Sequence, residues 1–248
     1  MTPQGKRSGR ILIGTSGYSY AHWKGIFYPQ TVSSTRMLTL YAETFPTVEI
    51  NYSFYHLPQE KTLRNWMSRV KSEFLFVLKA SKLITHNKKL AQVEEDLNAF
   101  CERARILGDQ LACVLFQLPP SLHKDLDRLK TFLALLPRDM RHAIEFRHDS
   151  WVDERVFRLL KRNGVAYCIV SAPKLKTLCR ATADFTYIRF HGSKKWYSYN
   201  YEDEELAVWA DRIRELAQDA RDVYAFFNND YMGYAPKNAS RLMELLVQ

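Results

Sequence analysis

The chain has 248 residues, of which 46% are hydrophobic and 13% aromatic, and its formal net charge is +9. No apolar run approaches the ~20 residues of a membrane span, and the basic stretch 1–9 lacks the apolar core of a signal peptide. These features exclude a membrane protein. The four cysteines show no metal-binding spacing: Cys101, Cys113, Cys168 and Cys179. Cys113 and Cys168 lie in apolar runs, which favours buried thiols in a reducing cytoplasm. We expect a cytoplasmic protein with a basic tail over residues 1–9 and a single domain over residues 10–248.

Eight apolar runs have the length and composition of β-strands. They cover residues 10–16, 48–55, 74–81, 112–118, 142–148, 165–171, 185–191 and 223–229. Amphipathic helical patterns separate most of them, over residues 35–45, 59–70, 90–107, 125–136, 150–163, 202–220 and 236–247. Ser150 with Asp153 resembles a capping box at the start of one helix, and Gly164 is placed to end it. The crossover 172–183 is too short and irregular for a regular helix.

Strands that alternate with helices along one chain of this length predict a closed parallel barrel of the TIM type, (β/α)8, in a single α/β domain. An open doubly wound sheet is the alternative. Neither a Gly-x-Gly-x-x-Gly run nor a phosphate-loop pattern is present to support it.

Each predicted strand is apolar at its start and polar near its end. Because side chains alternate along a strand, residues two apart share one face. Four pairs with this spacing occur at strand ends: Glu49 with Asn51, Glu145 with Arg147, Arg189 with His191, and Asn228 with Asp230. Lys79 and Gln117 lie at corresponding positions near the carboxyl ends of their predicted strands. The active site of such a barrel lies at the carboxyl ends of its strands, so we expect these residues to line a polar mouth.

The segments at that end of the barrel are basic and aromatic. Four of them contain no acidic residue: 16–42, 74–93, 171–183 and 185–201. Such a mouth attracts anions. Rings beside lysines suit stacking on bases or sugars, and the candidates are Trp23, Trp196 and Tyr197, with 196–201 as a lid. The alternative is that the rings pack the loops and that the lysines are ordinary surface charges.

The residue types leave several chemistries open. Lys79, Arg147 and Arg189 match a phosphate, with Glu145 or Asp230 and His191 as acid and base. A divalent metal would need ligands such as Glu49, Glu145, His191 and Asp230, although the cations in the same mouth would repel it. Two carboxylates flanking a sugar would indicate glycoside hydrolysis. The simplest alternative is a structural Glu145–Arg147 ion pair.

Several ordered blocks resemble the YecE-like family, a domain of unknown function. They include Gly14-Thr15-Ser16-Gly17-Tyr18, Trp23-Lys24-Gly25, Thr85-His86, Gln117-Leu118-Pro119-Pro120, Glu145-Phe146-Arg147-His148, Arg189-Phe190-His191-Gly192 and Phe227-Asn228-Asn229-Asp230. The likeness spans essentially the whole chain, apart from residues 172–183. It implies a TIM-type barrel and no established reaction.

Two hypotheses follow. The first is a hydrolase or lyase, most simply a phosphoester hydrolase, that acts on an anionic phosphate-bearing small molecule or on nucleic acid. The second is a non-catalytic module that binds nucleic acid or another anion. In the sharpest version, Arg147 and Arg189 hold the anion, Glu145 pairs with them in the empty site, and His191, near its working pKa, passes a proton. The cofactor and the oligomeric state stay open.

Overall fold

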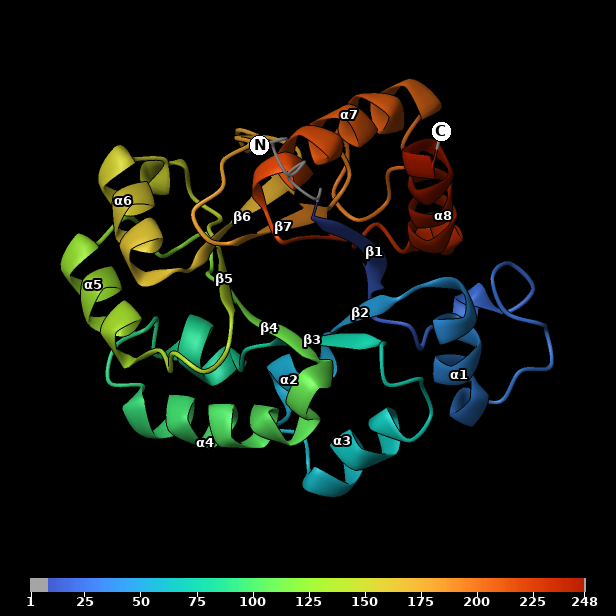
Figure 1. Cartoon of the computed structure of the whole chain (residues 1–248), viewed down its shortest axis with the longest axis horizontal. Coiled ribbons are helices and arrows are strands. Elements are labelled where there is room, and N and C mark those ends of the chain that lie inside the picture. The colour runs from blue at the N-terminus through green and yellow to red at the C-terminus, as the bar shows by residue number, and fades with distance from the viewer. Residues whose placement is uncertain (1–8, 248) are drawn as a thin grey trace, which may run out of the picture.

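The computed structural model describes residues 9–247, and the expected tail falls outside it except for Gly9. Eight parallel strands close into a barrel in which neighbours in the chain are neighbours in the sheet, and β8 pairs with β1. The predicted TIM-type barrel is therefore confirmed (Figure 1). The strands are β1 (Arg10–Ser16), β2 (Thr47–Ile50), β3 (Leu75–Lys79), β4 (Leu111–Gln117), β5 (His142–Glu145), β6 (Ala166–Ser171), β7 (Phe185–Phe190) and β8 (Asp222–Phe227).

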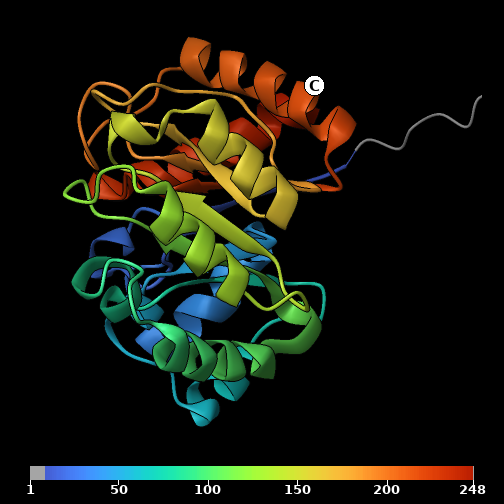
Figure 2. The same ribbon diagram turned by 90° about the vertical axis from the view of Figure 1, so that its left-hand side faces the viewer.

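The α-helices surround the barrel and follow one another around its wall, as the side view shows (Figure 2). They are α1 (Ser34–Thr44), α2 (Tyr52–Tyr55), α3 (Glu60–Met67), α4 (Glu94–Ala104), α5 (Leu126–Leu135), α6 (Glu154–Asn163), α7 (Asp203–Asp219) and α8 (Tyr234–Val247). A π-turn over Leu83–Asn87 and a 3-10 segment over Arg105–Gln110 lie on either side of α4.

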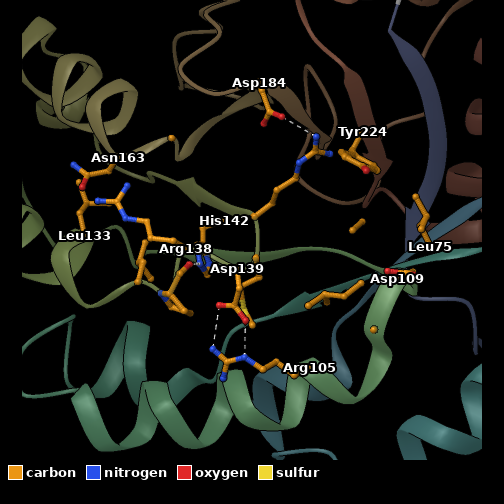
Figure 3. A pocket seen from close by; sticks show the side chains of 18 of the residues that line it. Leu75, Arg105, Asp109, Leu133, Arg138, Asp139, His142, Asn163, Asp184 and Tyr224 are labelled. Carbon is orange, nitrogen blue, oxygen red and sulfur yellow. Dashed lines mark hydrogen bonds and ion pairs between the residues drawn. The ribbon is translucent and has the colours of Figure 1, made fainter.

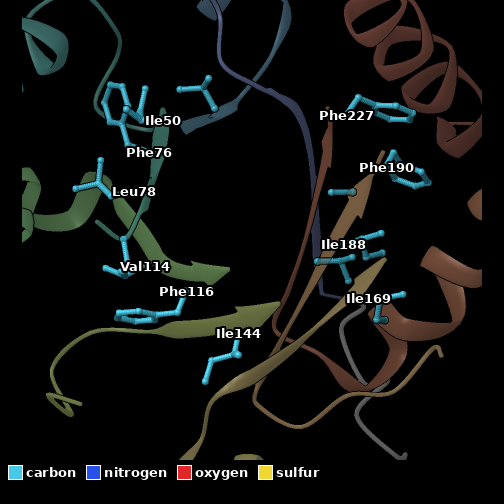
Figure 4. Close-up of a cluster of buried hydrophobic side chains, with 14 of the residues drawn as sticks. Ile50, Phe76, Leu78, Val114, Phe116, Ile144, Ile169, Ile188, Phe190 and Phe227 are labelled. Carbon is cyan, nitrogen blue, oxygen red and sulfur yellow. The ribbon is translucent and has the colours of Figure 1, made fainter. Parts of the chain in front are cut away.

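Strand alternation divides the apolar residues into two layers. Outward-facing residues such as Phe76, Phe116 and Phe190 pack between the barrel and the helices (Figure 4). Inward-facing residues such as Val77, Ala143 and Phe226 form a separate buried cluster inside the barrel. A strand buried on both faces needs apolar residues at consecutive positions, which is why most strand residues are apolar. Polar residues lie near the strand ends, as Thr47, His142 and Asp222 do at the starts of β2, β5 and β8.

Several predicted boundaries are wrong. The strand predicted over residues 142–148 ends at Glu145, and the helix predicted over residues 90–107 spans Glu94–Ala104. The run predicted as strand 48–55 leaves the sheet after Ile50, because the hydroxyl of Ser53 donates to the carbonyls of Ile50 and Lys79 and the chain turns into α2. Helix α6 is capped by Asp153, whose carboxylate accepts from the backbone of Arg155, and not by Ser150. Ser150 instead accepts a hydrogen bond from the backbone of Lys124. Gly164 does end the helix in a left-handed conformation, as predicted.

The crossover between β6 and β7 has no helix, as predicted from residues 172–183. Side-chain hydrogen bonds replace it. Thr177 donates to the carbonyl of Val170, and Thr182 both donates to the carbonyl of Val165 and accepts from the backbone of Tyr167. These hydrogen bonds connect the crossover to both ends of β6.

Two further expectations concern the burial of cysteines and membrane-spanning helices. Cys113 and Cys168 are buried inside the barrel, as predicted. Within residues 9–247, no helix has the length and apolarity needed to cross a membrane.

Candidate functional site at the barrel mouth

Strand alternation directs six of the predicted polar residues into the barrel near the carboxyl ends of the strands: Glu49, Lys79, Gln117, Glu145, Arg189 and Asn228. On each strand, the residue two positions earlier belongs to the inner apolar cluster or contacts it: Val77 before Lys79, Leu115 before Gln117, Ala143 before Glu145, Tyr187 before Arg189 and Phe226 before Asn228. Glu49, from β2, reaches Tyr187 and Arg189 across the barrel. The carboxyl ends of the strands therefore enclose one charged layer.

Arg189 bridges the two buried carboxylates of this layer. Its Nη1 lies 2.6 Å from Glu145 Oε2 and its Nη2 lies 2.6 Å from Glu49 Oε1, and none of the three side chains is more than 1% exposed. The guanidinium is thus bound to two carboxylates of the protein and buried from solvent. The expectation that Arg189 holds an anion is not supported by this geometry, since both of its terminal nitrogens already have buried partners.

Glu145 is the centre of a second set of contacts. Arg147 donates through Nε to Glu145 Oε1, and His191 Nε2 lies 3.3 Å from the same oxygen. Burial alone would raise the pKa of Glu145, but Arg147, Arg189 and His191 outweigh it and hold the pKa well below its ordinary value. Glu145 is therefore ionised and has no proton to give near neutral pH.

His191 is fully buried and neutral. Burial and then the charge of Arg147 lower its pKa to about 3. The side-chain nitrogen of Asn228 lies 3.2 Å from Nδ1, and Nε2 lies 3.1 Å from Arg147 Nη2 and 3.3 Å from Glu145 Oε1. The prediction that His191 titrates near a working pKa is wrong, because the sequence pattern contains no measure of desolvation.

Lys79 is the remaining cation of the mouth. Its Nζ lies 4.2 Å from the centroid of the Phe54 ring, and it forms no salt bridge with any carboxylate among residues 9–247. Burial and then Arg189 lower its pKa to about 8, against the opposing pull of Glu49 and Glu145. Unlike the two arginines, Lys79 keeps an amine without an anionic partner and retains some exposure to solvent.

The sequence reasoning missed two participants, and only one of them had a usable signal. Tyr187 donates its hydroxyl to Glu49 Oε2 at 2.6 Å; its place two residues before Arg189 could have revealed it. His86, from the π-turn, packs edge-on against Phe54 with ring centroids 5.0 Å apart. Burial and then Lys79 lower the pKa of His86 to about 4. Its position follows from a turn that no periodicity marks.

The aromatic segment after β7 covers part of the mouth. The Arg147 guanidinium lies 4.8 Å from the centroid of the Trp196 ring, and its Nη1 lies 3.4 Å from the hydroxyl of Tyr197. The chain approaches closely at Gly192, which has φ of +103°, and a Cβ there would meet Lys195 O at 2.2 Å. This segment places two of the predicted ring residues beside a cation of the mouth.

Four other predicted residues have different places. Trp23 is fully buried among the aromatic residues after β1, so its ring is not free to stack on a ligand. Asp230 pairs with His22, 3.6 Å away. Asn51 lines a hollow of ≈ 460 Å³ beside the mouth, together with Tyr20 and others. Gln117 is buried and donates to the carbonyl of Leu118.

The predicted metal ligands do not come together. Arg189 lies between Glu49 and Glu145, and Asp230 belongs to the pair with His22. In the part of the chain that the structure describes, no three His, Cys, Asp or Glu side chains form a group that could hold a metal ion.

A larger hollow, of ≈ 860 Å³, opens at the opposite face, where the strands begin (Figure 3). Its arginines are largely paired: Arg141 lies 2.6 Å from Asp222 and 2.9 Å from Asp184, and Arg105 contacts Asp139 at 2.7 Å. In barrels of this type, the face where strands begin contributes to stability and the opposite face carries chemistry. We therefore place the candidate site at the mouth.

Three of the basic loops are partly neutralised by acids. Lys88 contacts Asp96 at 2.6 Å, Lys194 lies 3.6 Å from Glu202, and Arg180 pairs with Glu154. Within residues 9–247, five other lysines of these loops form no salt bridge, and the loops therefore keep an excess of positive charge in addition to that of the inner residues: Lys82, Lys89, Lys174, Lys176 and Lys195.

Comparison with known proteins identifies the family. The family model described as "Protein of unknown function DUF72" matches residues 12–248. The chain belongs to the DUF72 family. The UPF0759 protein YunF of Bacillus subtilis is 30% identical over 273 residues, covering 95% of this DUF72 chain and 94% of YunF. The UPF0759 protein YecE of Escherichia coli K12 is 24% identical, covering 94% and 92%. The YecE-like resemblance is thereby confirmed.

Solved DUF72 structures have the same fold as this chain. The crystal structure of a DUF72 protein from Thermotoga maritima superimposes with a TM-score of 0.89 at 28% identity, covering 96% of this DUF72 chain and all (100%) of the other. A DUF72 protein from Enterococcus faecalis gives a TM-score of 0.81 at 23% identity, covering 98% and 99%.

Proposed function

We propose that the mouth of the barrel binds an anionic, phosphate-bearing small molecule through Lys79 and Arg147. The observation that carries this proposal is the charge balance of the mouth. Lys79, Arg147 and Arg189 face only Glu49 and Glu145, and the two carboxylates are occupied by the two arginines. One positive charge, that of Lys79, is left without a partner. A partly buried, unpaired cation is costly unless a ligand neutralises it.

The position of Arg147 supports the same ligand. Its Nε is bonded to Glu145, while Nη1 and Nη2 point toward Tyr197 and His191, which are neutral partners. An arginine whose terminal nitrogens lack a carboxylate can donate to a phosphate, and a lysine beside it supplies a compact second charge. The Trp196 ring orients the guanidinium from one side.

Binding is better supported than acid–base hydrolysis. A general acid must carry a proton, and the pKa of Glu145 lies well below its ordinary range. A general base near neutral pH should titrate there, and His191 has a pKa of about 3. Glycoside hydrolysis needs a free nucleophilic carboxylate, whereas Glu49 and Glu145 both accept from Arg189.

Nucleic acid is the second candidate ligand. Exposed rings at this end of the barrel favour it: Tyr52 is 47% exposed, Tyr55 68% and Tyr197 43%. Aromatic platforms beside cations suit unstacked bases. We further infer a cytoplasmic location, because all four cysteines are free thiols.

Calorimetric titration with inorganic phosphate and pyrophosphate at low salt tests the proposal. Lys79→Met should weaken binding about 10-fold to 100-fold, because a charged hydrogen bond contributes roughly 1.5–3 kcal/mol. Lys82→Met is the matched control, since Lys82 is an exposed lysine three residues away. No binding by the wild-type protein, or equal affinity in Lys79→Met, would reject the proposal.

A single-stranded oligonucleotide titrated at two salt concentrations tests the second candidate. Affinity should fall steeply with salt, by about one counterion for each phosphate contacted. Flat salt dependence or no binding at low salt would leave the small anion as the ligand class.

A further inference from the structure

Lys79 differs from the other cations of the mouth in what surrounds its charged atom. It stands at the end of β3, its Nζ faces the Phe54 ring at 4.2 Å, and no carboxylate of residues 9–247 forms a salt bridge with it. Arg147 and Arg189, by contrast, are each bonded to a carboxylate. An amine in this setting has its lone pair close to an aromatic face and to the opening of the barrel.

The surroundings raise the fraction of neutral amine. Burial and then Arg189 lower the pKa of Lys79 to about 8; Arg147 acts in the same direction, and Glu49 and Glu145 oppose it. At about pH 7.5 roughly a quarter of such amines are neutral, against about 0.1% for an ordinary lysine. A lysine that is desolvated and next to other cations is an activated nucleophile toward carbonyl carbon.

His86 lies close to this amine. Its ring and Lys79 Nζ both lie against Phe54. Burial and then Lys79 lower the pKa of His86 to about 4, so the ring is neutral near neutral pH and adds no positive charge beside Nζ.

We propose that Lys79 forms an imine with the aldehyde or ketone group of a phosphate-bearing ligand. The inference rests on the proposed function, since the phosphate held by Arg147 is what places the carbonyl beside Nζ. It adds a covalent step and narrows the ligand to phosphorylated carbonyl compounds.

The step is balanced by the release of water. The Nζ lone pair attacks the carbonyl carbon, the C–N bond forms, and the electron pair of the C=O bond moves to oxygen. A proton passes from nitrogen to that oxygen through water, which gives a carbinolamine. A second proton transfer to the oxygen lets it leave as water while the nitrogen lone pair completes the C=N bond. No oxidant or reductant is needed, and hydrolysis reverses the sequence.

Reductive trapping with pyridoxal 5′-phosphate, an aldehyde that carries a phosphate, tests the inference. The protein is incubated with the aldehyde at about pH 7.5, reduced with borohydride, and digested for peptide mass spectrometry. Lys79 should be labelled well before the exposed Lys82, since roughly a quarter of the Lys79 amines are neutral at this pH. Inorganic phosphate should compete with this labelling, and pyridoxal without the phosphate should label Lys79 much more slowly.

Variants test the covalent step at this position. Lys79→Arg removes the amine nucleophile and should lose the label. Lys82→Arg should keep the label on Lys79 at the rate of the wild-type protein.

Two results would overturn the inference in different ways. If phosphate binds through Lys79 while the label spreads over exposed lysines and spares Lys79, the imine is wrong and the proposed function stands. If Lys79 is labelled equally by pyridoxal and its phosphate, and phosphate does not compete, the phosphate-bearing class is wrong and the proposed function fails with it.

Discussion

Arg189→Met should destabilise the folded protein strongly, because it removes the cation between two buried carboxylates. Glu145 would keep Arg147, whereas Glu49 would keep only the hydroxyl of Tyr187. One buried charge is therefore left uncompensated. Removing one partner of a buried ion pair costs about 3–5 kcal/mol. For a chain of this size, that corresponds to a fall in Tm of roughly 6–20 °C.

Urea unfolding followed by circular dichroism measures the free energy of unfolding directly. The deficit of Arg189→Met should be larger near pH 7 than near pH 5, because protonation of the stranded carboxylate removes the buried charge. The double variant Arg189→Met with Glu49→Gln should recover at least half of the loss, since it removes the uncompensated charge as well. Arg64→Met is the control, because its pair with Glu60 is largely exposed and contributes little.

Two outcomes would refute this reasoning. One is a Tm for Arg189→Met within a degree or two of the wild-type value. The other is a double variant no more stable than the single one. Either would mean that water reaches Glu49, and that Arg189 is free to bind a ligand as the sequence predicted.

Three further predictions concern the surroundings of the site. The ring-proton NMR signal of His191 should stay constant between about pH 5 and pH 8, because its pKa is about 3; a midpoint near the ordinary value of ~6.5 would contradict this. Below about pH 6.5 the unfolded chain binds a proton at this histidine and the folded protein does not, so the free energy of unfolding should decrease as the pH is lowered. Trp23→Ala should cost about 3–5 kcal/mol in urea unfolding without changing phosphate affinity in the folded fraction; weaker binding at unchanged stability would restore Trp23 as a ligand contact. Gly192→Ala should lower both Tm and phosphate affinity, because its Cβ would meet Lys195 O at 2.2 Å. Gly164→Ala, whose Cβ meets nothing within 4 Å, should cost only the roughly 1 kcal/mol of left-handed strain.

The sequence by itself determined the barrel and the direction of its polar residues. Apolar runs separated by helical patterns have one compact solution at this length, and alternation alone places Ala143 and Glu145 on the face opposite Ile144. The ring of polar residues at the strand ends followed without any knowledge of contacts. The predicted end of β2 was wrong because the strand ends where Ser53 donates to the carbonyls of Ile50 and Lys79. Lys79 belongs to β3, and a pattern within one strand does not reveal a contact with another.

Only the tertiary structure decided which of these residues is free to act. Arg189 contacts Glu49 and Glu145 because closure of the barrel places the ends of β2, β5 and β7 at the same height along the barrel axis. This height is set by the register of strand pairing around the whole barrel and cannot be read from one strand. The pKa of His191 is lowered by burial that all surrounding elements create. Lys79 is left unpaired only once the arginines have taken the carboxylates. A local sequence pattern specifies the direction in which a side chain points. Its hydrogen-bond partners and its burial depend on all the elements packed around it, and these determine its pKa and its freedom to bind a ligand.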